Sequence, residues 1–171
     1  AVARAGLKAE DIEDVVMGCV LPAGLKQGPA RQAMRLAGLP DGTGATTINK
    51  LCGPGMRATM FCHDMIKAGS HDIVVTGGME SMSNAPYILD KARGGYRMGH
   101  GQVADHMFLD GLEDAETGRL MGAFAPDVAA QRGISRQQLD DFAIHSIKRA
   151  HAATDNRCFA APLASGALQH R

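Results

Sequence analysis

The sequence predicts an α/β fold with a layered, mostly parallel β-sheet. Three strand-like and two helix-like segments alternate in the first half of the chain, and this order implies right-handed βαβ crossovers. Residues 15–20 form a continuous apolar run, which is typical of a strand buried on both faces. Glycine is abundant, at 21 of 171 residues, so we expect close approaches between backbones. Sheets of this kind bind ligands at the carboxyl ends of their strands.

The early elements each have their own sequence signal. Residues 1–6 resemble the last turns of a helix, and the apolar strand at 15–20 follows them. A short helix begins at Pro29, because proline favours a first helical turn, and it ends before Gly38. A second strand is predicted at 45–49.

A longer helix is predicted at 53–69, directly after the second strand, and Gly69 is its C-terminal stop. Large side chains recur on one face of this helix at helical spacing: Met56, Met60, His63 and Ile66. A third strand at 73–76 completes the alternation.

The pattern changes from Met79 onward, where glycine, methionine, asparagine and proline cluster, and we expect a loop excursion there. A helix is predicted at 121–131 with Pro126 in its first turn. A helix at 136–151 has a clear start, because Ser135 and Gln138 form a capping box. Apolar residues line one face of this last helix: Leu139, Phe142, Ala143, Ile147 and Ala150.

The composition fits a globular protein and argues against nucleic-acid binding and against a membrane-spanning segment. Hydrophobic residues make up 45% and charged residues 21% of the chain, and the 18 basic residues balance the 18 acidic ones. A chain with balanced charge lacks the basic field that nucleic-acid binding requires, which argues against that binding as its main role. No apolar run reaches the roughly 20 residues of a transmembrane helix, and residues 1–8 lack the apolar stretch of a secretory signal. We therefore expect a cytoplasmic protein without nucleic-acid or membrane partners.

The cysteines and histidines do not form a metal-binding pattern. Four cysteines are present, at Cys19, Cys52, Cys62 and Cys158, without a C-x-x-C pair and without a matching pair of histidines. The sequence therefore predicts no metal site and no disulfide framework.

Cys52 is the strongest candidate for chemistry, because it stands where a strand ends and a helix begins. Unpaired N–H groups and the helix dipole stabilise a thiolate at such a position. The alternative interpretation is a small buried hydrophobic residue, which describes most free cysteines.

The same turn also matches a dinucleotide fingerprint, with Gly53, Gly55 and Ala58 as its G-x-G-x-x-A and Glu80 as the acid that would bind ribose. Pro54 argues against it, because proline removes an N–H where the backbone would approach a pyrophosphate. A nicotinamide-binding domain is therefore only a third alternative.

Two longer segments resemble one known family. INKLCGPGMRA at 48–58 resembles the nucleophile segment of thiolases, and GGMESMSNAPY at 77–87 is similar to the second signature of that family. The resemblance extends over residues 5–157 and is closest to acetyl-CoA C-acetyltransferases. The chain departs from the family pattern at Pro54, where serine is usual, and at Leu120, where many members have histidine.

The resemblance implies a ping-pong acyl transfer. Cys52 would attack acetyl-CoA or a 3-ketoacyl-CoA and hold the acyl group as a thioester, in a Claisen condensation or a thiolysis. A coenzyme A thioester is then the substrate, without a tightly bound cofactor. Leu112 and Met121 would contact pantetheine and the acyl group, the alternative for both being core packing. The full-length parent is expected to be a homodimer or homotetramer, paired through residues 87–101.

The resemblance also divides the chain. Residues 1–85 would be the amino-terminal core without the family's first strand, residues 86–157 part of its loop domain, and residues 158–171 a divergent tail, so the fold is expected to be incomplete at both ends. The family's catalytic histidine has no counterpart here, and we assign the base to none of these: His63, His71, His100, His106, His145 and His151. The alternative function is a non-catalytic thiolase remnant with at most a role in oligomerisation.

Overall fold

The structure is a computed structural model of the chain, and it describes residues 1–158. Contacts divide the chain into two compact units, Ala1–Leu120 and Met121–Arg171. This division does not test the domain boundaries expected after residues 85 and 157. All of the expected tail except Cys158 lies outside the described residues.

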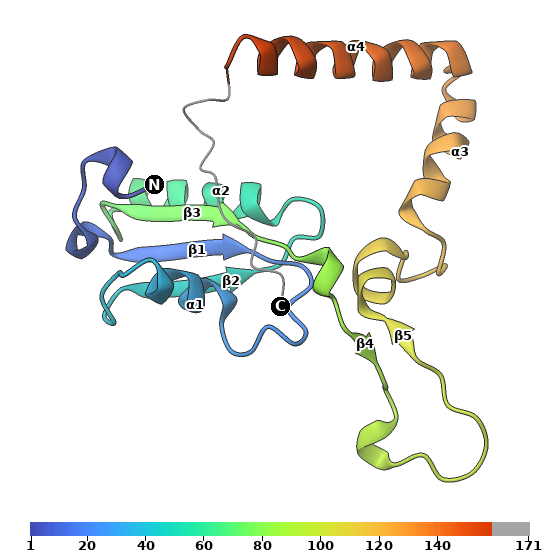
Figure 1. Ribbon diagram of the computed structural model, residues 1–171, viewed down its shortest axis with the longest axis horizontal. Helices are drawn as coiled ribbons and strands as arrows, with labels where there is room; N and C mark the ends of the chain where they lie inside the picture. Colours follow the sequence, from blue (N-terminus) through green and yellow to red (C-terminus); the bar gives the residue numbers. More distant parts are fainter. Residues whose placement is uncertain (159–171) are drawn as a thin grey trace. The chain divides into compact units, whose positions relative to one another are not determined.

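The first unit contains the predicted parallel sheet (Figure 1). Its strands have the order β2-β1-β3. The bounds are Asp14–Gly18 for β1, Gly44–Ile48 for β2 and Val74–Gly78 for β3, within two residues of the predictions. The parallel register pairs Gly18 with Ile48 on one side and with Gly78 on the other. All three strands therefore end at one edge of the sheet, and the predicted α/β fold class is confirmed.

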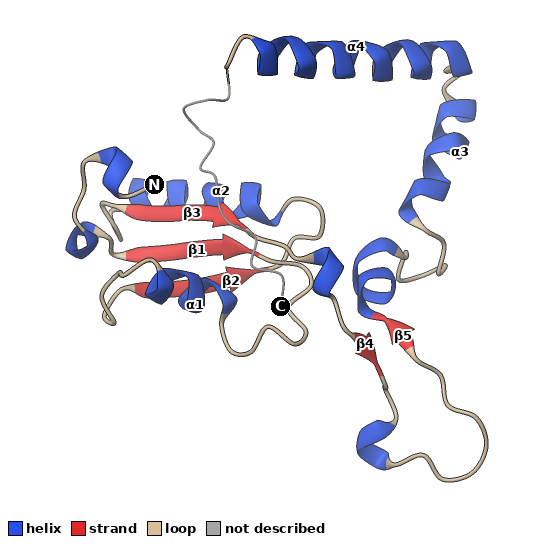
Figure 2. Cartoon of the chain, viewed as in Figure 1, coloured by secondary structure: helices blue, strands red, loops and turns tan. Residues whose placement is uncertain are grey.

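Two helices cover opposite faces of this sheet (Figure 2). They are α1 (Pro29–Leu36), which begins with proline as predicted, and α2 (Pro54–Lys67), which begins one residue after the predicted start at Gly53. Met34 of α1 packs in one core cluster with Val15, whereas Ala58 and Cys62 of α2 pack in another with Val16. Consecutive strand residues point to opposite faces, so the neighbours Val15 and Val16 place the two helices on opposite sides.

The large side chains predicted to share a face of α2 do not form its buried face. Met56 is 70% exposed, and Met60, His63 and Ile66 are exposed as well. The buried positions of α2 are the small residues Ala58 and Cys62. The reason is steric, because a helix that lies close to the sheet can bring only small side chains between the two backbones.

The remainder of the first unit has little regular structure, in agreement with the expected loop excursion. Residues 3–5 form a short 3₁₀ turn rather than the end of an α-helix. After β3 the chain makes a two-stranded antiparallel ladder of β4 (Tyr87–Ile88) and β5 (Ala104–Asp105). A π-helical turn at Phe108–Leu112 follows β5.

The second unit contains α3 (Phe124–Gln131) and α4 (Arg136–Asp155). Pro126 lies in the first turn of α3, and the predicted capping box is present: Ser135 N–H donates to Gln138 over 2.8 Å, and Gln138 N–H donates to Ser135 Oγ over 3.2 Å. The predicted apolar face of α4 is not buried within this unit, since Phe142 is 78% exposed. Among residues 1–158, no helix is long and apolar enough to cross a membrane.

A carboxylate joins β1 to β3 at the start of the sheet. Glu13 Oε2 accepts hydrogen bonds from the N–H groups of Asp72, over 2.6 Å, and Ile73, over 3.1 Å. These two backbone bonds hold the pKa of Glu13 below its ordinary value, because they stabilise the ionised carboxylate.

The Glu13 contact makes stability depend on pH. A carboxyl group whose pKa is lower in the folded state stabilises the protein above its unfolded-state pKa and loses that contribution as the pH falls through its folded-state pKa. Between neutral pH and about pH 3, a range that includes the ordinary glutamate pKa, we expect Glu13→Gln to lose less stability than the unaltered protein. Urea unfolding at both pH values measures this, with the exposed Glu10→Gln as control. Equal losses in all three proteins would contradict the expectation.

Candidate active site

Three glycines bring the start of α2 against the edge of the sheet. They are Gly18 at the end of β1, Gly78 at the end of β3 and Gly55 in the first turn of α2. A Cβ atom on Gly18 would lie 2.5 Å from the Gly55 nitrogen, and one on Gly78 would lie 3.3 Å from the Gly55 Cα. The first contact leaves no room for a side chain and the second is tighter than ordinary packing, so the helix start lies directly on the carboxyl edge of β1 and β3.

The turn that carries Cys52 is fixed by its own backbone. Asn49 Oδ1 accepts the N–H of Leu51 over 2.9 Å, and the N–H of Gly53 donates to the Lys50 carbonyl over 3.1 Å. Leu51 has a left-handed conformation with φ of 46°, which is uncommon for a residue with a side chain. This turn leaves Cys52 exposed, two residues before the first helical residue, Pro54.

Cys52 lines a pocket of about 240 Å³ in the first unit. Most of its walls are apolar, formed by Val20, Leu21, Leu51, Pro54, Met82, Met107, Gly111 and Leu112. The structure thus brings two of the three predicted site residues, Cys52 and Leu112, to one pocket. The third, Met121, is the first residue of the second unit, where its side chain is exposed, and its contact with an acyl group stays a prediction.

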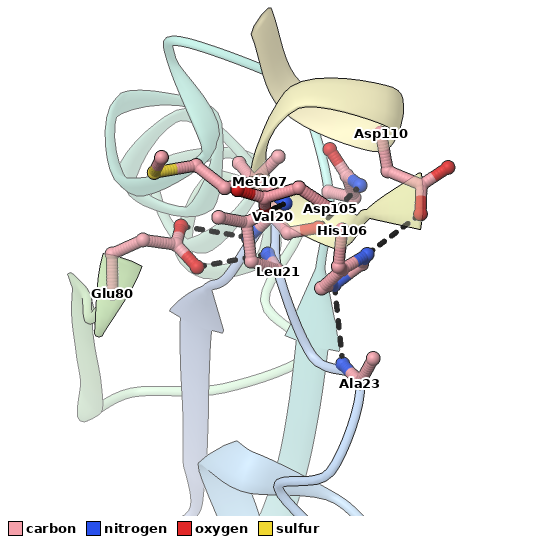
Figure 3. Close-up of polar contacts among 9 residues, drawn as sticks. Val20, Leu21, Ala23, Glu80, Asp105, His106, Met107 and Asp110 are labelled. Carbon is pink, nitrogen blue, oxygen red and sulfur yellow. Dashed lines mark hydrogen bonds and ion pairs between the residues drawn. The ribbon is translucent and has the colours of Figure 1, made fainter. Parts of the chain in front are cut away.

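Glu80, also in the pocket wall, has a role that the sequence did not reveal. Its carboxylate accepts the N–H groups of Val20 and Leu21, each over 2.8 Å (Figure 3). It also accepts the thiol of Cys19 over 3.5 Å. Both oxygens therefore bind the chain itself. The dinucleotide alternative assigned this acid to a ribose, whereas here its carboxylate binds the backbone that follows β1.

His106 is a second residue that sequence reasoning did not place. It is only 4% exposed, its Nδ1 lies 2.6 Å from an Asp110 oxygen, and its Nε2 accepts the N–H of Ala23 over 3.4 Å. The sequence indicated a surface or packing histidine, and the second description is correct. Its four-residue spacing from Asp110 was the available signal.

The four thiols differ in exposure. Cys19 is 1% and Cys62 2% exposed, while Cys52 and Cys158 are exposed. Burial raises the pKa of both Cys19 and Cys62, and the Glu80 carboxylate raises that of Cys19 further. Cys52 is thus the accessible thiol of the first unit. Within the part of the chain that the structure describes, no group of three or more histidines, cysteines or acidic residues could hold a metal ion.

The fold and the site together define a class: α/β proteins that present an exposed cysteine at a strand-to-helix turn, on the carboxyl edge of a parallel sheet. The chain belongs to the thiolase family, since residues 1–165 match the family described as "Thiolase, N-terminal domain".

Similar proteins agree with this family. The chain is 49% identical over 150 residues to an acetyl-CoA acetyltransferase of Chromobacterium violaceum, covering 88% of this chain and 38% of that protein. It is 44% identical over 164 residues to an acetyl-CoA acetyltransferase of Escherichia coli, covering 95% and 42%. The crystal structure of a thiolase from Ascaris suum in complex with coenzyme A matches with a TM-score of 0.88 at 36% identity, over 94% of this chain and 41% of that one. The chain thus spans about two fifths of these relatives.

The glycine contact predicts a sharp response to one methyl group. Gly18→Ala would force its Cβ against the Gly55 nitrogen, so we expect a loss of stability of about 1–3 kcal/mol and a displaced Cys52 turn. The matched control is Gly42→Ala, where a Cβ meets no atom within 4 Å. Urea midpoints and the alkylation rate of Cys52 measure both effects. A Gly18→Ala protein that matches the control would disprove the close contact.

Exposure and position together predict an order of thiol reactivity. We expect iodoacetamide near neutral pH to modify the two exposed thiols first, Cys52 before α2 and Cys158 after α4. Cys19 and Cys62 should react much more slowly, since both are buried. Peptide mass spectrometry over time gives the four rates. Equal rates at Cys52, Cys19 and Cys62 would exclude Cys52 as a special nucleophile.

Proposed function

We propose that this chain supplies the acyl-carrying half of an acyl-CoA acetyltransferase, with Cys52 as the nucleophile. The observation that carries the proposal is the exposed thiol of Cys52 beside an apolar pocket of about 240 Å³. The names of the related proteins, acetyl-CoA acetyltransferases, support acetyl-CoA as the substrate class.

In the first step the Cys52 sulfur attacks the thioester carbonyl of acetyl-CoA or a 3-ketoacyl-CoA. A bond forms between Sγ and the carbonyl carbon, the bond to the coenzyme A sulfur breaks, and coenzyme A takes up the proton of the thiol. The backbone N–H of Cys52, near the start of α2, is suited to stabilise the negative oxygen of the tetrahedral intermediate. Acyl activation is conserved, because one thioester replaces another.

The pocket walls suit a short acyl chain and the apolar part of pantetheine. Leu112 lines the same pocket as Cys52, which supports its proposed contact with pantetheine. A matching contact by Met121 with the acyl group is part of the proposal. Coenzyme A thioester acts here as substrate rather than as a bound cofactor.

The second step, a Claisen condensation or a thiolysis, needs a general base. His106 is not suited to this task, because both ring nitrogens already have partners in Asp110 and Ala23. No histidine is among the residues of the first unit that line the Cys52 pocket. The proposal therefore assigns the acyl-carrier role to this chain and leaves the base to another part of the enzyme.

We also propose a cytoplasmic homodimer or homotetramer for the full-length enzyme, with residues 87–101 as a pairing loop. Tyr87, Leu89 and Met98 are exposed apolar side chains of this loop, and such exposed residues favour a contact with another chain. The same exposure fits the alternative of a non-catalytic remnant that only takes part in oligomerisation.

Acylation of Cys52 distinguishes the two functions. We expect acetyl-CoA to add one acetyl group to Cys52 and to release one equivalent of free coenzyme A, detected by intact mass and by a thiol assay. Cys52→Ala should abolish the adduct, whereas Cys158→Ala, which removes the other exposed thiol, should retain it. An adduct that persists in Cys52→Ala would contradict the assignment. Failure of acetylation at a Cys52 that iodoacetamide modifies normally would favour the remnant.

A further inference from the structure

The segment that follows β1, residues 20–23, is held by side chains from two distant parts of the first unit (Figure 3). Glu80, from just after β3, accepts the N–H groups of Val20 and Leu21 over 2.8 Å each. His106, from just after β5, accepts the N–H of Ala23 over 3.4 Å. A loop without regular secondary structure thus has three of its backbone donors bound by two side chains.

The Glu80 contact requires a carboxylate. Oε2 accepts from Val20, while Oε1 accepts from Leu21 and from the thiol of Cys19. Both oxygens are acceptors, and bonds from backbone N–H groups to an ionised acceptor are stronger than neutral ones. A glutamine at this position keeps one acceptor oxygen and turns an NH₂ group toward another donor.

The His106 contact requires one tautomer. Because Nε2 accepts the N–H of Ala23, the ring proton lies on Nδ1, which donates to the Asp110 oxygen 2.6 Å away. The backbone on each side is fixed as well: His106 N–H donates to the Pro86 carbonyl over 3.1 Å, and Met107 N–H donates to Asp105 Oδ1 over 2.9 Å. The buried ring is therefore held in place by contacts that do not involve the 20–23 segment.

The 20–23 segment forms part of the Cys52 pocket. Val20 and Leu21 line the pocket together with Gly111 and Leu112. A Cβ on Gly111 would lie 3.3 Å from Leu21 Cδ2, so Leu21 packs closely on the turn at Phe108–Leu112. A shift of this segment would therefore move one wall of the pocket.

The same segment reaches the turn that carries Cys52. Asn49 Nδ2 donates to the Val20 carbonyl over 3.5 Å, while Asn49 Oδ1 accepts the N–H of Leu51 in that turn. The segment that Glu80 and His106 hold is thus connected, through Asn49, to the turn that carries the Cys52 thiol.

We propose that Glu80 and His106 are positioning residues that hold the 20–23 segment as a wall of the Cys52 pocket, so that a coenzyme A thioester reaches the thiol in a productive orientation. The proposal rests on the proposed acyl-carrier function of Cys52. It assigns no chemical step to either residue. A small reagent such as iodoacetamide needs only an exposed thiol, whereas a thioester also needs the wall.

The test compares two reactions of Cys52 in the full chain, acetylation by acetyl-CoA and alkylation by iodoacetamide. Loss of one hydrogen bond of about 1 kcal/mol corresponds to about fivefold, so we expect Glu80→Gln and His106→Leu to lower the acetylation rate about fivefold or more. We expect the alkylation rate to stay within about twofold, because no contact of Cys52 itself is lost. His106→Gln, whose side-chain oxygen can accept the N–H of Ala23, should restore most of the acetylation rate. Glu116→Gln, an exposed carboxylate of the same unit, is the matched control.

Hydrogen exchange gives an independent measure of the same contacts. The amide protons of Val20 and Leu21 should exchange faster in Glu80→Gln, and that of Ala23 should exchange faster in His106→Leu. The comparison in each case is with the unaltered protein and with Glu116→Gln. Equal loss of acetylation and alkylation, or no rescue by His106→Gln, would overturn the positioning role. If Cys52 of the unaltered protein is alkylated by iodoacetamide but not acetylated by acetyl-CoA, the proposed function is overturned. If hydrogen exchange at residues 20–23 is also unchanged in Glu80→Gln and His106→Leu, the wall contacts are overturned as well.

Discussion

The contact between backbone atoms at Gly18, Gly55 and Gly78 is the constraint on which the rest of the first unit depends. A side chain at Gly18 would collide with the first turn of α2 at 2.5 Å, so the helix and the sheet edge meet without any side chain between them. Because the register pairs Gly18 with Gly78, two adjacent strand ends without side chains lie against the start of the helix. The same approach distance explains why Ala58 and Cys62, rather than the methionines, face the sheet.

The position of Cys52 follows from this contact. The chain leaves β2 at Ile48 and enters α2 at Pro54, so it must reverse within a short turn whose two ends are fixed by the sheet. Leu51 adopts a left-handed conformation in that turn, at a cost of order 1–3 kcal/mol that the surrounding structure offsets. The result is a thiol that is exposed beside a pocket, while Cys19 and Cys62 lie within the core.

The pocket around Cys52 is built from segments that are far apart in the chain. Its apolar walls come from the segment after β1, the turn before α2, the 3₁₀ turn at Met82 and the turn at Phe108–Leu112. Loops of this kind have unpaired backbone groups, and buried or half-buried N–H groups need acceptors. Glu80 and His106 supply three such acceptors, and these fix the position of a pocket wall that has no regular secondary structure.

The sequence by itself determined the alternation of strands and helices, the helix starts at Pro29 and Arg136, the start of α2 to within one residue, and the place of Cys52 between a strand and a helix. These are local properties, set by periodicity, by proline and by the capping box of Ser135, and they can be read from a few neighbouring residues. Only the tertiary structure decided which face of α2 is buried, that Leu112 shares a pocket with Cys52, and that Glu80 and His106 bind the backbone 59 to 83 residues away. The reason is physical: such contacts depend on strand register and on the distance between packed backbones, and no local pattern encodes either quantity.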